Sequence, residues 1–386
     1  MKRFFFTFFM IFSMLLGACM LLTAVSAAYS YTGEAGPPML TLNYGSRALS
    51  LGGAYSGVAN DVYYMDSNPA GGDPRKVFKV SLIHQEWIED VNYEAVRLSY
   101  GINDQFFFGL GFTYLYLPFT YYDYYGYSDG NSYTISQGLG MVNVGYKLKN
   151  YDFAFGANIK LFFNNVPEAL YAGQNYLLFA GDIGVISRTH ILKTFIGPEP
   201  SLTVGCTLKN IGYSKVMAKL PTEVHFGMSY RLFRCLLLTG EAVFPFYEPI
   251  FGSVGAEFDI KKTLFIQGGV QIAENPMFAV GLGYRRKDVN VNVSYTPSLA
   301  FRNMMSVSIE FTFGDTKEDQ RVREIEALLV NALESFNDGN FKQALGYIEK
   351  VFELDSKNRR AKQLKKTTMK ELELDKRAEI VNGIKG

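Results

Sequence analysis

The sequence contains few of the residues on which metal sites, disulfide frameworks and cofactor sites depend. Its 386 residues include 3 cysteines, 3 histidines and a single tryptophan. Cys206 and Cys235, the cysteines beyond the N-terminal region, do not make a disulfide framework. His84, His190 and His225 lie far apart, with no cysteine or carboxylate at metal-ligand spacing. We therefore expect neither a metal site nor a cofactor.

Motifs of enzymes and of nucleic-acid-binding proteins are also missing. Gly138-x-Gly140 lacks the third glycine of a dinucleotide site and does not open a helical pattern. No phosphate-loop or nucleophile-elbow pattern occurs. Because 38 Lys and Arg balance 37 Asp and Glu, there is no basic footprint for nucleic acid. We expect a protein that is not an enzyme and binds no nucleic acid.

Charged residues make up only 19% of the chain, and their distribution is uneven. Residues 315–386 alone contain 15 Lys or Arg and 14 Asp or Glu, so the first 314 residues are charge-poor. Aromatic residues are abundant instead, with 32 Phe and 26 Tyr in the whole chain. The distribution predicts a charge-poor, aromatic-rich body followed by a highly charged tail.

One long apolar run occurs, over residues 4–22, directly after two basic residues. Small residues follow at 25–28, as at the cleavage site of an export signal. We predict a signal peptide over residues 1–28. One alternative is an uncleaved anchor, because the run has the length of a membrane-spanning helix. Another is lipidation of Cys19, which the apolar residues after it disfavour.

Between residues 77 and 313 apolar side chains alternate with small or polar ones, which is the period of a β-strand. In 306–313, for example, one face carries Val307, Ile309, Phe311 and Phe313, and the other carries Ser306, Ser308, Glu310 and Thr312. About 14 such segments occur: 77–87, 92–102, 105–117, 133–148, 151–163, 175–187, 201–210, 222–232, 235–244, 252–260, 263–272, 277–286, 288–297 and 304–313. Most have the length that a tilted strand needs to cross a bilayer.

The small and polar second face is typical of a lumen, whereas a soluble β-protein would bury its apolar face in a shared core. A closed barrel also satisfies every backbone group in lipid without leaving an edge. We therefore predict an all-β transmembrane barrel of about 14 antiparallel strands. Short turns at 102–105, 149–150, 232–234, 260–262 and 286–287 would face the periplasm, and longer loops at 118–132, 164–174, 211–221, 245–251 and 297–304 the outside. The connection at 188–200 breaks this pattern.

Residues 45–72 are rich in small residues, almost uncharged and not strand-like, and they end in Asn68-Pro69-Ala70-Gly71-Gly72. A barrel of this size is too wide to be filled by its own side chains, so the segment suits a plug. Residues 46–54, 59–61 and 68–71 resemble the N-terminal hatch of FadL-type outer-membrane transporters, including their PorV-like branch. The resemblance covers roughly residues 38–314.

The resemblance implies a 14-stranded barrel closed by a hatch that ends in Asn-Pro-Ala. It implies that long-chain fatty acids or similar hydrophobic ligands are caught at external loops and pass to a pocket beside the hatch. They would leave sideways at a kink in the third strand. Asn68, Pro69 and Ala70 would face that strand, or else only shape a turn. Gly109 and Gly111 would permit the kink, or else be ordinary lumen-facing glycines.

The predicted loop over residues 117–134 contains six tyrosines. Aromatic side chains provide rigid apolar surface at little entropic cost, which suits an external catch for acyl chains. The candidate ligand-binding residues here are Phe119, Tyr121, Tyr122, Tyr124, Tyr125 and Tyr127. The alternative is the interfacial aromatic girdle that such barrels carry.

Residues 318–382 have apolar residues at spacings of three and four, which predicts helices. The stretch resembles a single tetratricopeptide repeat at Gly339, Phe341, Ala344, Tyr347 and Leu354-Asp355, although Ser356 replaces the usual proline. One repeat rarely buries a stable core. The tail is therefore expected to dock on the barrel rim or on a partner, the alternative being a solvated helical hairpin.

We thus expect a signal peptide (1–28), a hatch inside the lumen (29–74), a barrel (75–314) and a small periplasmic α-helical domain (315–386). The expected function is passive transport of long-chain fatty acids or similar hydrophobic molecules across a bacterial outer membrane, with that ligand and the membrane lipid as partners. The alternative is a PorV-like scaffold for a secretion or assembly machine, with a periplasmic protein bound to residues 315–386. A third reading is an open polar pore.

Overall fold

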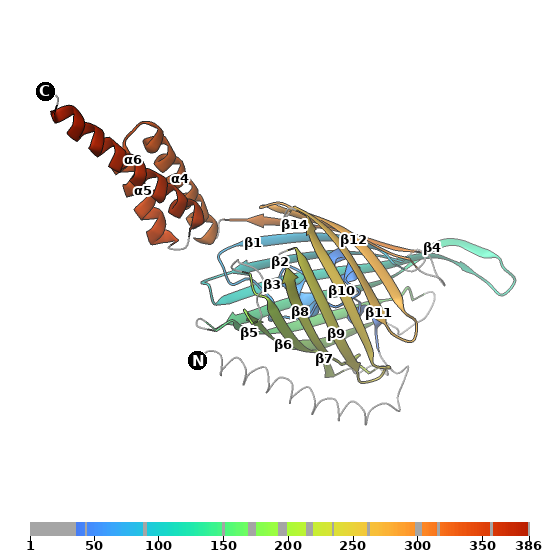
Figure 1. Cartoon of the computed structure of the whole chain (residues 1–386). Helices are drawn as coiled ribbons and strands as arrows, with labels where there is room; N and C mark the ends of the chain where they lie inside the picture. Colours follow the sequence, from blue (N-terminus) through green and yellow to red (C-terminus); the bar gives the residue numbers. More distant parts are fainter. Residues whose placement is uncertain are drawn as a thin grey trace. The chain divides into compact units, whose positions relative to one another are not determined.

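The computed structural model describes residues 36–42, 45–87, 91–148, 151–168, 175–191, 199–213, 219–233, 235–260, 263–297, 303–314, 317–355 and 358–384. The predicted signal peptide and Cys19 lie outside the described residues. The chain divides into two compact units, residues 1–314 and 315–386, and each is considered by itself (Figure 1).

Among the described residues, fourteen β-strands close into a barrel in which neighbours in the chain pair antiparallel and β14 pairs with β1. The strands are β1 (Phe78–Glu86), β2 (Asn92–Gly101), β3 (Phe106–Tyr122), β4 (Ser128–Lys147), β5 (Phe153–Asn165), β6 (Tyr176–Thr189), β7 (Leu202–Tyr213), β8 (Glu223–Phe233), β9 (Leu236–Pro245), β10 (Phe251–Ile260), β11 (Leu264–Ile272), β12 (Met277–Arg285), β13 (Val289–Thr296) and β14 (Met304–Phe313). The predicted barrel of about 14 antiparallel strands is confirmed.

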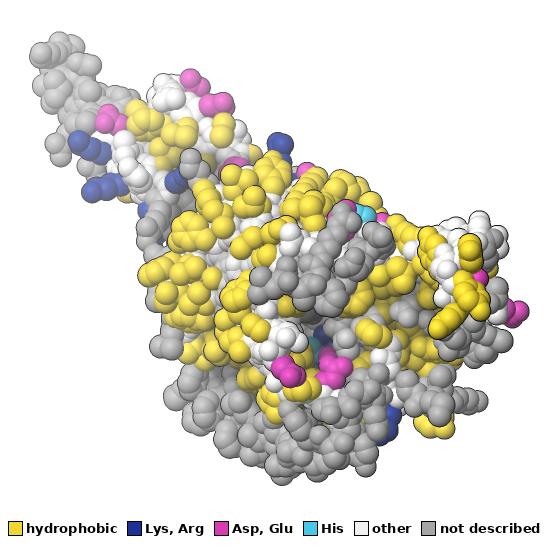
Figure 2. Space-filling view, turned by 90° about the vertical axis from the view of Figure 1, so that its right-hand side faces the viewer, with side chains coloured by type: hydrophobic (Ala, Val, Ile, Leu, Met, Phe, Trp, Pro, Cys, Tyr) yellow, Lys and Arg dark blue, Asp and Glu magenta, His cyan; other side chains and the backbone are white. Residues whose placement is uncertain are grey.

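The barrel is apolar outside and polar inside, the reverse of a water-soluble β-protein. In β14, the lumen-facing Ser306, Ser308 and Glu310 are 1–6% exposed, whereas Phe313 on the other face is 54% exposed. Hydrophobic side chains cover much of the barrel wall visible in Figure 2. Each buried large apolar side chain stabilises a fold in water by about 1.5–3 kcal/mol, so an exterior of this kind is suited to an apolar solvent.

The two ends of the barrel differ. β1 begins and β14 ends at one end, called proximal here, and the opposite end is called distal. Proximal connections are short, such as 102–105 between β2 and β3, except for 190–201 between β6 and β7, where the predicted pattern also broke.

The predicted distal loop at 118–132 is wrong. β3 and β4 continue as a hairpin that extends beyond the other strands (Figure 1), with Phe119 paired to Tyr133 and only residues 123–127 forming the turn. Asp123 closes this turn by accepting hydrogen bonds from the backbone amides of Tyr125 and Tyr127, at 2.9 and 2.8 Å. Aromatic and β-branched residues favour extended structure, and this preference prevailed over the loop expected from the alternation.

In the part of the chain that the structure describes, three short helical elements precede β1: η1 (Pro38–Leu40), α2 (Ser46–Ser50) and α3 (Tyr64–Ser67). Together with the turns between them they form what we call the N-terminal segment, residues 36–77. This segment contacts the inner face of the strands, and α2 lies against β11 to β14.

The second unit consists of α4 (Lys317–Asn337), α5 (Phe341–Leu354) and α6 (Arg359–Ile384). Its buried cluster contains Leu329, Ala332, Ile348, Val351 and Ala361 from all three helices. Phe336 meets the ring of Phe341 edge-on, with centroids 5.6 Å apart. None of the described helices is both long and apolar enough to cross a membrane.

The exposed apolar wall generates a first prediction. Ile159 of β5 is 69% exposed on the outer face, so Ile159→Arg should destabilise the protein folded in lipid vesicles by about 2–4 kcal/mol. The control Met369→Arg, at a 49% exposed position on α6, should change stability by no more than about 0.5 kcal/mol. Equal effects in denaturant titrations would contradict a lipid-facing wall.

Candidate functional site

Side chains that face the lumen form layers, because residues paired across neighbouring strands point to the same side. Near the distal end one layer runs through Ile83, Ala95, Thr113, Leu139, Phe162 and Leu178 of β1 to β6. We define the distal apolar cluster as the buried side chains of Ile83, Tyr93, Ala95, Leu115, Leu139, Phe162, Leu178 and Ala180, with Met39 and Leu40 of η1 packed among them. It forms an apolar region at the distal end of the lumen.

The next layer toward the proximal end is charged. Arg97 of β2 is fully buried and makes a bidentate pair with Asp66 of the N-terminal segment, at 2.9 and 2.7 Å. Lys160 of β5 lies 2.8 Å from Asp182 and donates to the side-chain oxygen of Asn210 at 3.0 Å. A layer of paired charges therefore lies on the proximal side of the distal apolar cluster.

The N-terminal segment is held to the opposite wall by a second buried ion pair. The Arg47 guanidinium donates to both carboxylate oxygens of Glu257 on β10, at 2.6 and 2.9 Å, and also contacts Tyr55, Asn60 and Asp61. Burial by itself would lower the pKa of Arg47, but the charges of its acidic partners raise that pKa well above its ordinary value. The pair is consequently ionic, and such bidentate contacts are strong and geometrically specific.

Hydroxyls and amides complete the contacts around the ring. Ser46 is 2.9 Å from Ser306 of β14, Tyr63 bonds Ser81 of β1, and the Tyr64 hydroxyl donates to Asn143 of β4 at 2.9 Å. Burial raises the pKa of both Tyr63 and Tyr64, so both are neutral hydroxyls. The wall thus supplies partners for most of the buried polar side chains of the segment, the Ser56 hydroxyl being an exception.

Glycines on the inner wall let the backbone of the segment approach. A Cβ added at any of nine positions on described strands would lie closer than 3.0 Å to the segment: Gly101, Gly109, Gly156, Gly184, Gly205, Gly227, Gly255, Gly269 and Gly281. Gly255 and Gly269, for example, face Leu51. A side chain there would meet backbone or packed atoms that cannot move aside cheaply, so these glycines define the space the segment fills.

The predicted motif Asn68-Pro69-Ala70 lies mainly against β4 to β7. The Asn68 amide donates to the carbonyls of Ser56 and Val185 at 3.2 and 3.0 Å, and its oxygen accepts from the Ala70 amide at 3.1 Å. The Pro69 carbonyl accepts from Asn143 at 3.1 Å. Only Ala70 shares a buried cluster with a residue of β3, Phe107. The motif thus shapes a turn and also contacts the wall.

Gly109 and Gly111 face the lumen, but β3 is regular at both. Met65 and Tyr64 lie against Gly109, and the Arg97 side chain lies against Gly111. Pairing with β2 and β4 runs through both glycines without a register shift. The ladder therefore has no gap at these positions, where both glycines face the lumen and admit neighbouring side chains; the kink itself stays a prediction. A register shift does occur between Gly181 and Ile183 on β6, opposite Asn210, whose φ is 57°.

The aromatic residues predicted as a catch lie on the β3–β4 hairpin. Tyr121, Tyr122, Tyr124, Tyr125 and Tyr127 are 47–96% exposed at its tip. By strand alternation Leu117 and Phe119 continue the lumen-facing row of Leu115, and Phe119 stacks on Tyr133 with centroids 6.0 Å apart. An apolar row thus runs from the hairpin into the distal apolar cluster.

Five charged lumen residues were not predicted as site residues from the sequence: Arg97, Lys160, Asp182, Glu241 and Glu257. The sequence signal that could have identified them is a charged residue on the small or polar face of an alternating strand. Among the described residues no three His, Cys, Asp or Glu side chains are grouped as metal ligands.

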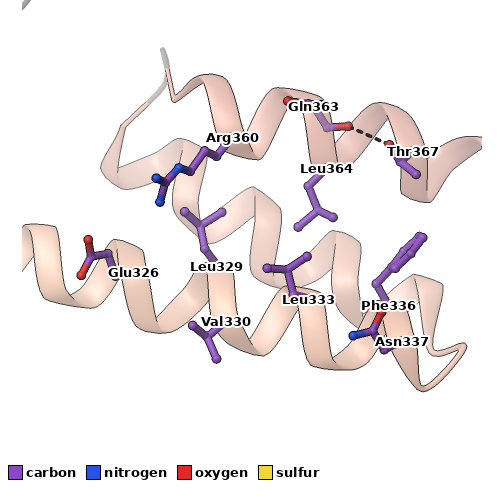
Figure 3. A pocket seen from close by; sticks show the side chains of 10 residues that line it. All are labelled: Glu326, Leu329, Val330, Leu333, Phe336, Asn337, Arg360, Gln363, Leu364 and Thr367. Carbon is purple, nitrogen blue, oxygen red and sulfur yellow. Dashed lines mark hydrogen bonds between the residues drawn. The ribbon is translucent and has the colours of Figure 1, made fainter.

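The helical unit contains a separate groove of about 570 Å³ between α4 and α6 (Figure 3). Leu329, Leu333, Phe336 and Leu364 form its apolar lining, with Arg360 and Glu326 at its edge. Val330 and Leu333 are 52% and 48% exposed. This volume is within the range of small-molecule sites.

Residues 23–313 match the family described as "Uncharacterised protein family (UPF0164)". The chain belongs to this family. It is 26% identical over 189 residues to a UPF0164 protein of Treponema pallidum (strain Nichols), covering 44% of this chain and 41% of the relative. A second such protein of that organism is 26% identical over 185 residues, covering 46% of this chain and 53% of the relative. The chain therefore spans about half or less of the length of these curated relatives.

Among solved structures, the chain is similar to the Pseudomonas putida toluene transporter TodX, with a TM-score of 0.49 and 12% identity over 70% of this chain and 98% of that one. It is also similar to a Pseudomonas aeruginosa FadL homologue, with a TM-score of 0.45 and 10% identity over 69% and 96%. The PorV-like branch and the tetratricopeptide character of the tail stay predictions.

The glycine-lined wall yields a second prediction with a neighbouring control. Gly269→Ala would press a methyl group into Leu51 and should make the N-terminal segment several-fold more sensitive to added protease. Gly268→Ala should leave it unchanged, because the nearest atom to its added Cβ is 4.0 Å away. Identical digestion of the two variants would mean that the segment does not depend on this contact.

Proposed function

We propose that this protein transfers hydrophobic molecules, long-chain fatty acids or similar compounds, passively across a bacterial outer membrane. The observation that carries the proposal is the apolar row from the exposed hairpin to the distal apolar cluster. Leu117, Phe119, Tyr133 and Ile135 lie on its hairpin part, and Leu115 and Leu139 continue it inside the barrel. A purely polar pore would have no use for such a row.

In this proposal the distal end faces outside, and the hairpin takes up ligand. The N-terminal segment, within residues 29–74, acts as the hatch that stops the lumen from conducting water and ions. Its support is the set of contacts with wall residues on nearly every side, including Arg47 with Glu257 and Arg97 with Asp66. Residues 315–386 then follow β14 on the periplasmic side.

Release would be lateral, as the FadL-type resemblance implies, but at a different strand pair. β3 is fully paired at Gly109 and Gly111. The irregular pairing between β6 and β7 lies beside Ala180 of the distal apolar cluster, and Asn210 there has a left-handed backbone. A bulge removes ladder hydrogen bonds locally, so we propose this site as the sideways exit.

The proposed transport generates a third prediction. Phe119→Asp should reduce oleate uptake into vesicles containing the protein by about tenfold, because it places a charge on the apolar row. Thr120→Asp, one residue along on the opposite face of β3, should retain uptake within about twofold. If the wild-type protein is active and Phe119→Asp takes up oleate equally well, the ligand does not pass along the hairpin.

A second candidate function is a scaffold for a secretion or assembly machine, and the groove between α4 and α6 favours it. Exposed apolar side chains such as Val330 and Leu333 suit the apolar face of a partner helix. Arg360 and Glu326 at its edge would select charges of opposite sign on that partner.

The scaffold candidate makes a fourth prediction. A periplasmic partner that co-purifies with the full-length wild-type protein should be lost in Leu333→Glu, which places a charge in the groove. It should be retained in Met369→Glu, which changes an equally exposed position outside the groove lining. Retention in both variants would exclude the groove as the docking site.

A further inference from the structure

Glu241 of β9 links the N-terminal segment to a buried histidine. Its Oε2 accepts hydrogen bonds from two successive amides of the segment, those of Tyr55 at 2.8 Å and Ser56 at 2.7 Å. Its Oε1 lies 2.7 Å from Nδ1 of His225 on β8. One carboxylate therefore joins the segment to the ring of His225.

The second nitrogen of the ring is engaged as well. Nε2 of His225 lies 2.9 Å from Oε2 of Glu223. The side chains of His225, Glu223 and Glu241 are 7%, 5% and 3% exposed, so water does not replace these partners. Ionised carboxylates only accept hydrogen bonds, so a ring bonded to two of them donates from both nitrogens and is the imidazolium.

Protonation of the ring offsets part of the negative charge around it. Lys209 of β7 is paired with Glu223 in the strand register, and Glu248 of the β9–β10 connection interacts with Glu223 from the distal side. The segment presents the amides of Tyr55 and Ser56, not a charged group, to Glu241. A protonated His225 and Lys209 thus offset the carboxylates of Glu223 and Glu241.

We propose that His225 is a proton-dependent latch for the N-terminal segment. At neutral and mildly acidic pH the imidazolium fixes Glu241 on the Tyr55 and Ser56 amides. When the ring loses its proton at higher pH, it donates to only one carboxylate and its free lone pair faces the other. The hydrogen bonds that Glu241 accepts from the Tyr55 and Ser56 amides then weaken. The physiological meaning, release of a hatch, rests on the proposed function, but the latch itself does not.

The test is hydrogen exchange of the full-length protein in lipid vesicles at pH 6 and pH 9, corrected for the intrinsic effect of pH on exchange. Protection of the Tyr55 and Ser56 amides should fall by about tenfold or more, the effect of losing a charge-assisted hydrogen bond. Protection of residues 46–50 should stay constant, because Arg47 and Glu257 hold them. If the protection of the Tyr55 and Ser56 amides is the same at both pH values, the proposal is overturned.

Two variants separate a latch from a merely structural histidine. In Glu223→Gln the glutamine amide can donate to Nε2 of a neutral ring while Nδ1 still donates to Glu241, so protection should be high at both pH values. In His225→Gln protection should be the same at both, whatever its level. Persistent pH dependence in either variant would overturn the latch. Oleate uptake measured on the same vesicles tests the transport proposal independently.

Discussion

The structure depends on the fit of the N-terminal segment into a lumen that is shaped for its backbone. Small inward glycines such as Gly156 and Gly269 leave room for the main chain, and buried acids such as Glu241 and Glu257 receive its amides and its one central arginine. Both conditions are necessary, because a buried polar group without a partner costs about 1–3 kcal/mol and a misplaced side chain costs a similar amount. The segment and the wall therefore specify each other.

The same requirement explains the composition of the wall. Each strand alternates so that one face meets the segment and the other meets an apolar solvent. Buried charged residues on the inner face are paired in the lumen, and Glu94 on the outer face pairs with His84. Arg97 with Asp66 and Lys160 with Asp182 are lumen pairs of this kind. The distal apolar cluster departs from this pattern on the inner face, and its continuity with the hairpin directs the functional proposal toward a hydrophobic ligand.

Much of the fold could be predicted from the sequence, because a period of two reports both the strand and its face. Ser306, Ser308 and Glu310 were placed on the inner face by pattern alone, and each is buried there. The hairpin beyond Leu117 could not be bounded, since its tyrosines suit a loop, a girdle or a strand equally. The contacts between the segment and the wall could not be predicted either, because Arg47 and Glu257, for example, are 210 residues apart and no local pattern connects them. Gly109 and Gly111 were placed on the correct face, but the regular pairing around them depends on both neighbouring strands.

The most direct test of this account is a cross-link between the segment and the wall in the membrane-embedded protein. With the three native cysteines replaced, Ser46→Cys and Ser306→Cys should form a disulfide under mild oxidation, because their hydroxyls are 2.9 Å apart. Ser46→Cys with Ser187→Cys, on β6 across the barrel, should not. Absence of the first cross-link, or equal formation of both, would contradict the placement of the segment on which the whole account stands.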